Sequence, residues 1–131
     1  MKRSEIQQYF KNGRVLVAPE AYAIAKTRRA IAGAFAVVRD RNEITCVVEE
    51  SKLRPRQCLG IEAGWRLLTF DMILPFSLVG FFALVSGALA EAGVSIFSIS
   101  AYSTDHIFVK QRDLERAAKA LEKLGVSIYR L

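Results

Sequence analysis

Hydrophobic side chains in the second half of the chain recur at two different spacings, and the change of spacing predicts strands and helices in turn. Leu68, Phe70 and Met72 alternate with other residues over 66–74, as in a strand that buries one face. After Asp113, apolar residues recur every three or four positions, at Leu114, Ala117, Ala118, Leu121 and Leu124. This is the spacing of a helix with one buried face, and Gly125 follows it as a typical helix-ending residue.

The remaining segments of the second half are predicted to form one more helix and three more strands. A helix is predicted to start near Phe76 or Ser77 and to end at Gly93. Strands are predicted over 94–101, 104–110 and 126–130, the first two joined by a tight turn at 102–103. The order over residues 66–131 is therefore β-α-β-β-α-β, the ferredoxin-like arrangement of four antiparallel strands with two helices on one face. The other face needs cover, either from the N-terminal strands or from another copy of the chain.

An uncharged, mostly apolar run from Met72 to Ala90 is 19 residues long, close to the length that spans a membrane. Pro75 divides it, because the residue before a proline avoids helical geometry. The remaining helix has about 16 residues and a length of about 24 Å, shorter than a hydrocarbon core of about 30 Å. The run therefore predicts a strand end, a turn and a buried helix. Gly87 in this helix either marks a close packing contact, within the chain or between subunits, or has no packing role.

The first half of the chain has a different pattern. A short helix is expected to end near Lys11, before Asn12 and Gly13. Short segments rich in β-branched or aromatic residues follow at 14–19, 21–26, 34–39 and 43–49, and the last two read as a hairpin. Residues 52–60 are expected to form a connector. This half is predicted to consist mostly of strands, without a long helix.

The 131 residues carry a formal charge of +6, and the excess lies in the first half. Residues 1–65 hold twelve Lys or Arg and seven Asp or Glu, a balance of +5, whereas residues 66–131 hold seven and six, a balance of +1. The basic residues are interleaved with acidic ones, which favours an ordinary solvated surface. Nucleic-acid binding is the less favoured alternative, and it would use Arg28, Arg29, Arg39 and Arg41.

Residues suited to catalysis or metal binding are scarce. His106 is the single histidine, and its neighbour Asp105 points to the opposite face of the predicted strand. Cys46 and Cys58 lack the paired spacing of a zinc site and are expected to be reduced. We therefore expect no enzyme activity, no metal site and no cofactor. The first residues lack the apolar region of a secretory signal, which predicts a cytoplasmic protein.

Three short strings resemble the ACT family. They are residues 78–80 (LVG), 91–96 (EAGVSI) and 100–109 (SAYSTDHIFV), and Asp113 and Leu114 follow them. The resemblance covers about residues 62–131 and is to tandem ACT domains, the type found in cytosolic arginine sensors and aspartokinase regulatory domains. It implies an α+β protein with a regular ferredoxin-like ACT domain at 62–131 and a smaller, strand-rich, divergent ACT-like unit at 1–61.

The resemblance also implies a ligand-binding site. ACT domains are regulatory and bind amino acids where two domains meet, so an amino acid or related metabolite is the expected ligand. The positions that match are Val79, Gly80, Ser95, Ile96, Ala101, Tyr102 and Asp105. Ser95 and Ile96 would contact the carboxylate, and Asp105 would bind the positive group. A single regular ACT unit implies that a second chain completes the site, so a homodimer is expected.

Taken together, the sequence predicts a regulatory or sensor protein that binds a small molecule at an interface between ACT units and controls a partner protein allosterically. A protein-interaction or structural module without a ligand is the alternative. In that case Tyr102 and Asp105 would lie on a partner-binding surface.

Overall fold

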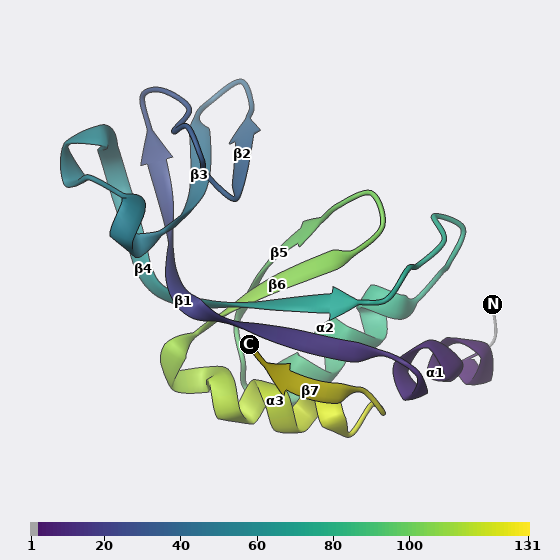
Figure 1. Cartoon of the computed structure of the whole chain (residues 1–131). Coiled ribbons are helices and arrows are strands. Elements are labelled where there is room, and N and C mark those ends of the chain that lie inside the picture. Colours follow the sequence, from purple (N-terminus) through teal and green to yellow (C-terminus); the bar gives the residue numbers. More distant parts are fainter. Residues whose placement is uncertain (1–2) are drawn as a thin grey trace. The chain divides into compact units, whose positions relative to one another are not determined.

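A computed structural model describes residues 3–131, with side chains from residue 5 onward (Figure 1). The helices are α1 (Arg3–Lys11), α2 (Phe81–Glu91) and α3 (Leu114–Glu122), and the short 3-10 turns are η1 (Glu50–Lys52), η2 (Pro55–Gln57) and η3 (Gln111–Asp113). The strands are β1 (Arg14–Thr27), β2 (Ala36–Arg39), β3 (Ile44–Glu49), β4 (Cys58–Asp71), β5 (Ile96–Ser100), β6 (Asp105–Lys110) and β7 (Ser127–Arg130). The protein has the predicted α+β fold, with a mainly antiparallel sheet and few helices.

The chain forms two compact units, which we call unit 1 and unit 2. Unit 1 comprises residues 1–19 and 66–131, and unit 2 comprises residues 20–65. These boundaries differ from the division at 61/62 that the sequence suggested, because the first helix and the start of β1 belong with the C-terminal residues. That a second ACT-like unit precedes the regular one stays a prediction.

Unit 1 follows the predicted order, with the second part of β4, then α2, β5, β6, α3 and β7. The prediction of four antiparallel strands is wrong in one respect. β1 lies next to β4, and β7 pairs with β1, in parallel, from Arg14 opposite Ser127 to Val17 opposite Arg130. β1 can take this central place because Val15 and Val17 alternate with more exposed residues and are fully buried.

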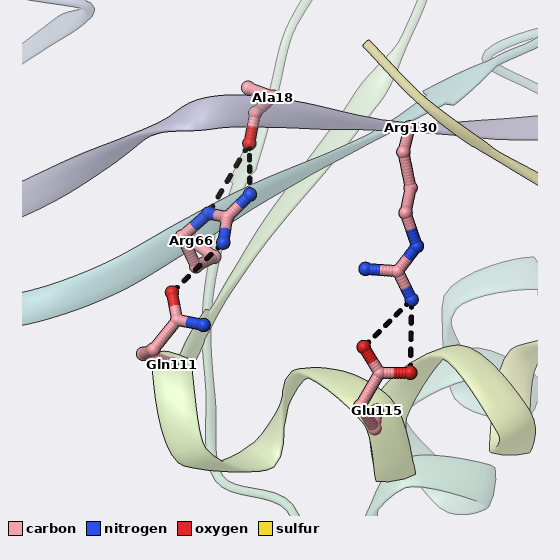
Figure 2. A network of polar contacts seen from close by, with 5 residues as sticks. All are labelled: Ala18, Arg66, Gln111, Glu115 and Arg130. Atoms are coloured by element: carbon pink, nitrogen blue, oxygen red, sulfur yellow. Dashed lines mark hydrogen bonds and ion pairs between the residues drawn. The ribbon is translucent and has the colours of Figure 1, made fainter.

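Side-chain hydrogen bonds from Arg66 of β4 and Arg130 of β7 connect strands and helices of unit 1 (Figure 2). The Arg66 guanidinium donates to the Ala18 carbonyl oxygen, at 2.8 Å from Nη2 and 3.3 Å from Nε, and to Gln111 Oε1 at 2.9 Å. Arg130 Nη2 donates to both carboxylate oxygens of Glu115, at 2.8 and 3.0 Å. The first set holds β1 just before Pro19, a residue that cannot donate a backbone hydrogen bond.

One apolar core joins the helices and strands of unit 1. Its buried members are Ile6, Phe10, Val15, Val17, Leu68, Phe70, Phe81, Val85, Leu89, Val94, Ile107, Val109, Leu114, Ala117, Leu121 and Val126. Three aromatic rings meet within it. The rings of Phe10 and Phe81 stack with centroids 4.8 Å apart, and the Phe70 ring meets Phe81 edge-on at 5.6 Å. Phe81 is the first residue of α2, so this contact fixes where that helix begins.

Unit 2 consists of strands and 3-10 turns around a smaller core. β3 pairs antiparallel with residues 22–27 of β1 on one side and with β2 on the other. Ile31, Cys46 and Val48 form one buried cluster, and Leu53 packs against it. β1 is a single strand, whereas two were expected at 14–19 and 21–26. β4 already begins at Cys58, within the expected connector.

The apolar run at 72–90 behaves differently from the prediction at its start. Leu78 N donates to the Pro75 carbonyl oxygen at 2.9 Å, which closes a turn, and Gly80 follows with φ of +92°. Helix α2 therefore begins at Phe81, four to five residues after the predicted start. A Cβ at Gly87 would have nothing within 4 Å, so no close contact is made there among the described residues. In residues 3–131, no helix has both the length and the apolar character that a membrane span requires.

We predict that Phe81→Ala lowers the free energy of unfolding by about 3–5 kcal/mol, because it leaves a cavity between Phe10 and Phe70. Urea denaturation followed by circular dichroism measures this loss. Phe76→Ala is the matched control, since the Phe76 ring is 78% exposed and its removal should cost less than about 1 kcal/mol. Equal losses of unfolding free energy in the two variants would contradict a stabilising role for the contact of Phe81 with Phe10 and Phe70.

Candidate functional site

Two loops of unit 1 border a cleft of about 310 Å³, at the small end of the range for ligand pockets. One loop runs from the end of β4 to the start of α2, and the other joins β5 to β6. The lining residues are Leu74, Pro75, Phe76, Leu78, Gly80, Phe81, Phe82, Ala83, Ser100, Ala101, Tyr102, Ser103, Thr104 and Asp105. We call this space the Asp105 cleft.

A backbone hydrogen bond joins the two loops, from Leu74 N to the Ser103 carbonyl oxygen at 3.4 Å. Within the β5–β6 loop, Ala101 N donates to the Thr104 carbonyl oxygen at 2.8 Å. The rings of Phe76 and Tyr102 meet edge-on, with centroids 5.1 Å apart. Both rings are largely exposed, at 78% and 82%. An exposed aromatic pair at the rim of a cleft offers a flat apolar surface to a ligand or a partner.

The first turn of α2 forms part of the wall. Gly80 precedes it in a left-handed conformation and supplies no capping side chain, and the first turn contains no acidic residue. The first amide groups of a helix have no intrahelical acceptor, and they form the positive end of the helix dipole. The turn therefore presents donors that suit a carboxylate.

Asp105 stands at the start of β6 and is half-buried. Of the described residues that line the cleft, it alone carries a formal charge at neutral pH. No Lys or Arg of the described part of the chain lies within 4 Å of its carboxylate. A half-buried carboxylate without a basic partner is suited to an ammonium group from a ligand.

The next residue, His106, has other neighbours. Its Nδ1 lies 2.9 Å from Thr69 Oγ1 and its Nε2 lies 3.3 Å from Thr104 Oγ1. Burial lowers the pKa of His106, and the nearby Asp105 carboxylate opposes this shift only in part. His106 is not among the residues that line the cleft. The two hydroxyl partners give it a structural role in the sheet.

The structure brings together four of the seven predicted site residues. Gly80, Ala101, Tyr102 and Asp105 all line the cleft. Val79 lies in the loop beside Gly80 but is 67% exposed and is not part of the lining.

The other two predicted residues lie elsewhere. Ser95 is exposed, and the side chain of Ile96 packs against the apolar core of unit 1. They stand at the opposite end of β5 from Ser100, about 13 Å away along the strand. They do not reach the cleft within one chain, and their role in ligand binding stays a prediction.

Sequence reasoning missed the apolar half of the lining, above all Leu74, Phe76, Leu78 and Phe82. Phe76 and Leu78 had been assigned to a buried helix, because an apolar run shows no difference between core and cleft wall. Pro75 and Gly80 together were the available signal. A proline turn followed by a glycine marks a loop, and it moves the helix start to the residue after Gly80.

The chain was compared with known families, sequences and structures. Residues 60–123 match the family model of the ACT domain. No similar sequence is found among curated proteins. The fold resembles that of protein Atu0741 from Agrobacterium tumefaciens, with a TM-score of 0.79 and 24% identity, over 91% of this chain and 93% of that one.

Two further structures share the fold. VC0802 from Vibrio cholerae, described as a protein of unknown function and possible transport protein, matches with a TM-score of 0.75 and 24% identity over 93% of this chain and 97% of that one. The regulatory subunit of aspartate kinase from Thermus thermophilus matches with a TM-score of 0.64 and 11% identity over 86% and 96%. At these identities the likeness shows the fold alone.

We predict that the free energy of unfolding falls as the pH is lowered from about 7.5 to about 5. The pKa of His106 is lower in the folded than in the unfolded protein, so the unfolded chain takes up a proton first and is stabilised by it. Urea unfolding at several pH values measures the slope. Since His106 is the only histidine, His106→Gln should flatten the profile across this window. An unchanged slope in that variant would assign the effect to other groups.

Proposed function

We propose that this chain, which carries an ACT domain over residues 60–123, is a regulatory protein that binds an amino acid or a closely related zwitterion in the Asp105 cleft. One observation supports this above the others. Two features border the same cleft: the Asp105 carboxylate, which has no Lys or Arg of the described residues within 4 Å, and the uncapped first turn of a helix. A free amino acid carries the two complementary charges on adjacent groups.

In this proposal each end of the cleft recognises one charge. The amide groups of Phe81, Phe82 and Ala83 receive the ligand carboxylate, and Asp105 receives the ammonium group. Phe76 and Tyr102 cover the remainder of the ligand from the loop side. The arrangement requires a glycine at position 80. Its φ of +92° is one that other residues rarely adopt, and a Cβ there would lie 3.3 Å from Ile6 Cδ1.

A regulatory role fits the chemistry of the cleft better than catalysis does. The lining contains hydroxyl groups but no histidine or lysine to activate them. One structural neighbour is the regulatory subunit of an aspartate kinase. We propose that this chain likewise acts by binding, and that a partner protein responds to the liganded form.

A second copy of the chain completes the site in our proposal. The exposed apolar residues of the two loops are Ile73, Phe76, Val79 and Tyr102, each at least 67% accessible. Such a patch is typical of a surface that another protein covers. Ser95 and Ile96, which the cleft lacks, would then come from the partner chain. A ligand held between two copies stabilises the dimer, with a coupling of about 1–3 kcal/mol.

We predict that isothermal titration with the twenty amino acids detects binding of at least one, and that Asp105→Asn weakens it by about tenfold or more. Loss of the carboxylate charge removes the partner of the ammonium group. Glu122→Gln is the matched control, because it removes the same charge from an exposed position on α3 that does not line the cleft. If no amino acid binds, the exposed loops indicate a protein-docking module without a ligand, and the proposal fails.

We also predict a preference among amino acids. Nine of the lining residues are apolar or aromatic, and Asp105 alone among them is charged. A ligand with a second cationic group would bury that charge without a partner. Neutral amino acids with an apolar side chain should therefore bind about tenfold or more tightly than lysine or arginine, and Tyr102→Ala should reduce the difference. Competition titrations measure the order, and tighter binding of arginine would contradict it.

A further inference from the structure

We infer that a second cleft, in unit 2, binds small phosphate-bearing anions. It has a volume of about 320 Å³ and is lined by Arg28, Arg29, Ala30, Ile31, Arg56 and Gln57. We call it the arginine cleft. Three of its six lining residues are arginines, and this inference does not depend on the function proposed for the Asp105 cleft.

The bend that carries Arg28 and Arg29 is held on both sides. Before it, the buried Thr27 donates its hydroxyl to the Arg29 carbonyl oxygen at 2.8 Å. After it, Ile31 packs into the core formed with Cys46 and Val48. The backbone between these anchors has little freedom, so the two guanidinium groups are presented by a rigid support.

The second segment that lines the cleft is also held in place. Arg56 lies in η2, which starts with Pro55 and is closed by a hydrogen bond from Arg54 N to Gln57 Oε1 at 3.1 Å. The Gln57 backbone amide also donates to the Arg54 carbonyl oxygen at 2.9 Å. A proline and two hydrogen bonds fix a turn of three residues, so Arg56 also stands on a preformed element.

The charges of this cleft are uncompensated. Arg28, Arg29 and Arg56 are exposed, and no carboxylate of residues 3–131 forms an ion pair with any of them. Three like charges around one hollow repel each other and raise the local concentration of anions. Guanidinium groups bind phosphate oxygens in pairs, with a geometry that ammonium groups lack.

A small molecule fits the arrangement better than a nucleic-acid strand does. The three arginines surround a hollow whose remaining wall includes Ala30 and the largely buried Ile31. Arg39 and Arg41, which would extend a basic track, lie at the turn between β2 and β3 and do not line the cleft. The expected ligand therefore carries two or more phosphate charges and an apolar portion, as a nucleoside diphosphate does.

Inorganic pyrophosphate is the probe, titrated calorimetrically into the full chain. We expect saturable binding that weakens with added salt, because the partly exposed charges are screened. Arg29→Gln and Arg56→Gln should each weaken binding by about tenfold, the loss of one charge-assisted contact. Arg41→Gln, which removes the same charge outside the cleft, should leave affinity within about twofold. Arg29→Lys should fall between wild type and Arg29→Gln, because it keeps the charge and loses the paired geometry.

Two results would overturn the inference. The first is an absence of pyrophosphate binding by wild-type protein that is folded by circular dichroism. The second is equal weakening by Arg29→Gln and Arg41→Gln, together with tight binding of a single-stranded oligonucleotide, which would indicate a distributed nucleic-acid surface. Asp105→Asn should not affect pyrophosphate binding, and amino-acid binding should not change in Arg29→Gln, so the failure of either proposal is recognisable separately.

Discussion

The burial of the Phe81 ring between Phe10 and Phe70 is the contact on which the rest of unit 1 depends. It joins α1, β4 and the first residue of α2 in one place. Because that residue cannot move without opening the core, the turn that precedes it is fixed as well. The exposed loop at 72–80 therefore has a rigid end, and the amide donors at the start of α2 have a defined position beside Asp105. Loose packing around Phe81 would leave the first turn of α2, which lines the cleft, without a fixed position.

β1 is a single long strand that pairs with a different neighbour at each end. Its first residues pair with β7, and residues 22–27 pair with β3. Pro19 lies between these two regions and cannot donate a ladder hydrogen bond. The Arg66 guanidinium donates two hydrogen bonds to the neighbouring Ala18 carbonyl oxygen, in place of a backbone donor. A proline in a long strand is thus tolerated at the point where the pairing changes, and a side chain satisfies the backbone there.

Much of this fold could be predicted from periodicity, and the parts that could not have a physical reason. The order of elements from β4 to β7 followed from the alternation at Leu68 and Phe70 and from the helical spacing after Asp113. The place of β1 between β4 and β7 did not, since local spacing carries no information on which strands pair at long range. Leu78 illustrates the limit for the site, because its hydrophobicity is equally consistent with a core and with a cleft wall.

The structure groups charged residues that appear scattered in the sequence. By sequence, the basic excess of the first half looked like scattered surface charge, and only the family resemblance distinguished Asp105 from the other twelve acidic residues. In the structure Lys26, Lys52 and Arg14 face carboxylates, whereas Arg28, Arg29 and Arg56 gather around one hollow. Among the described residues that line the Asp105 cleft, Asp105 alone is charged. A net charge of +6 attracts anions to the whole molecule. Only the local arrangement decides that one cleft suits an ammonium group and the other a phosphate.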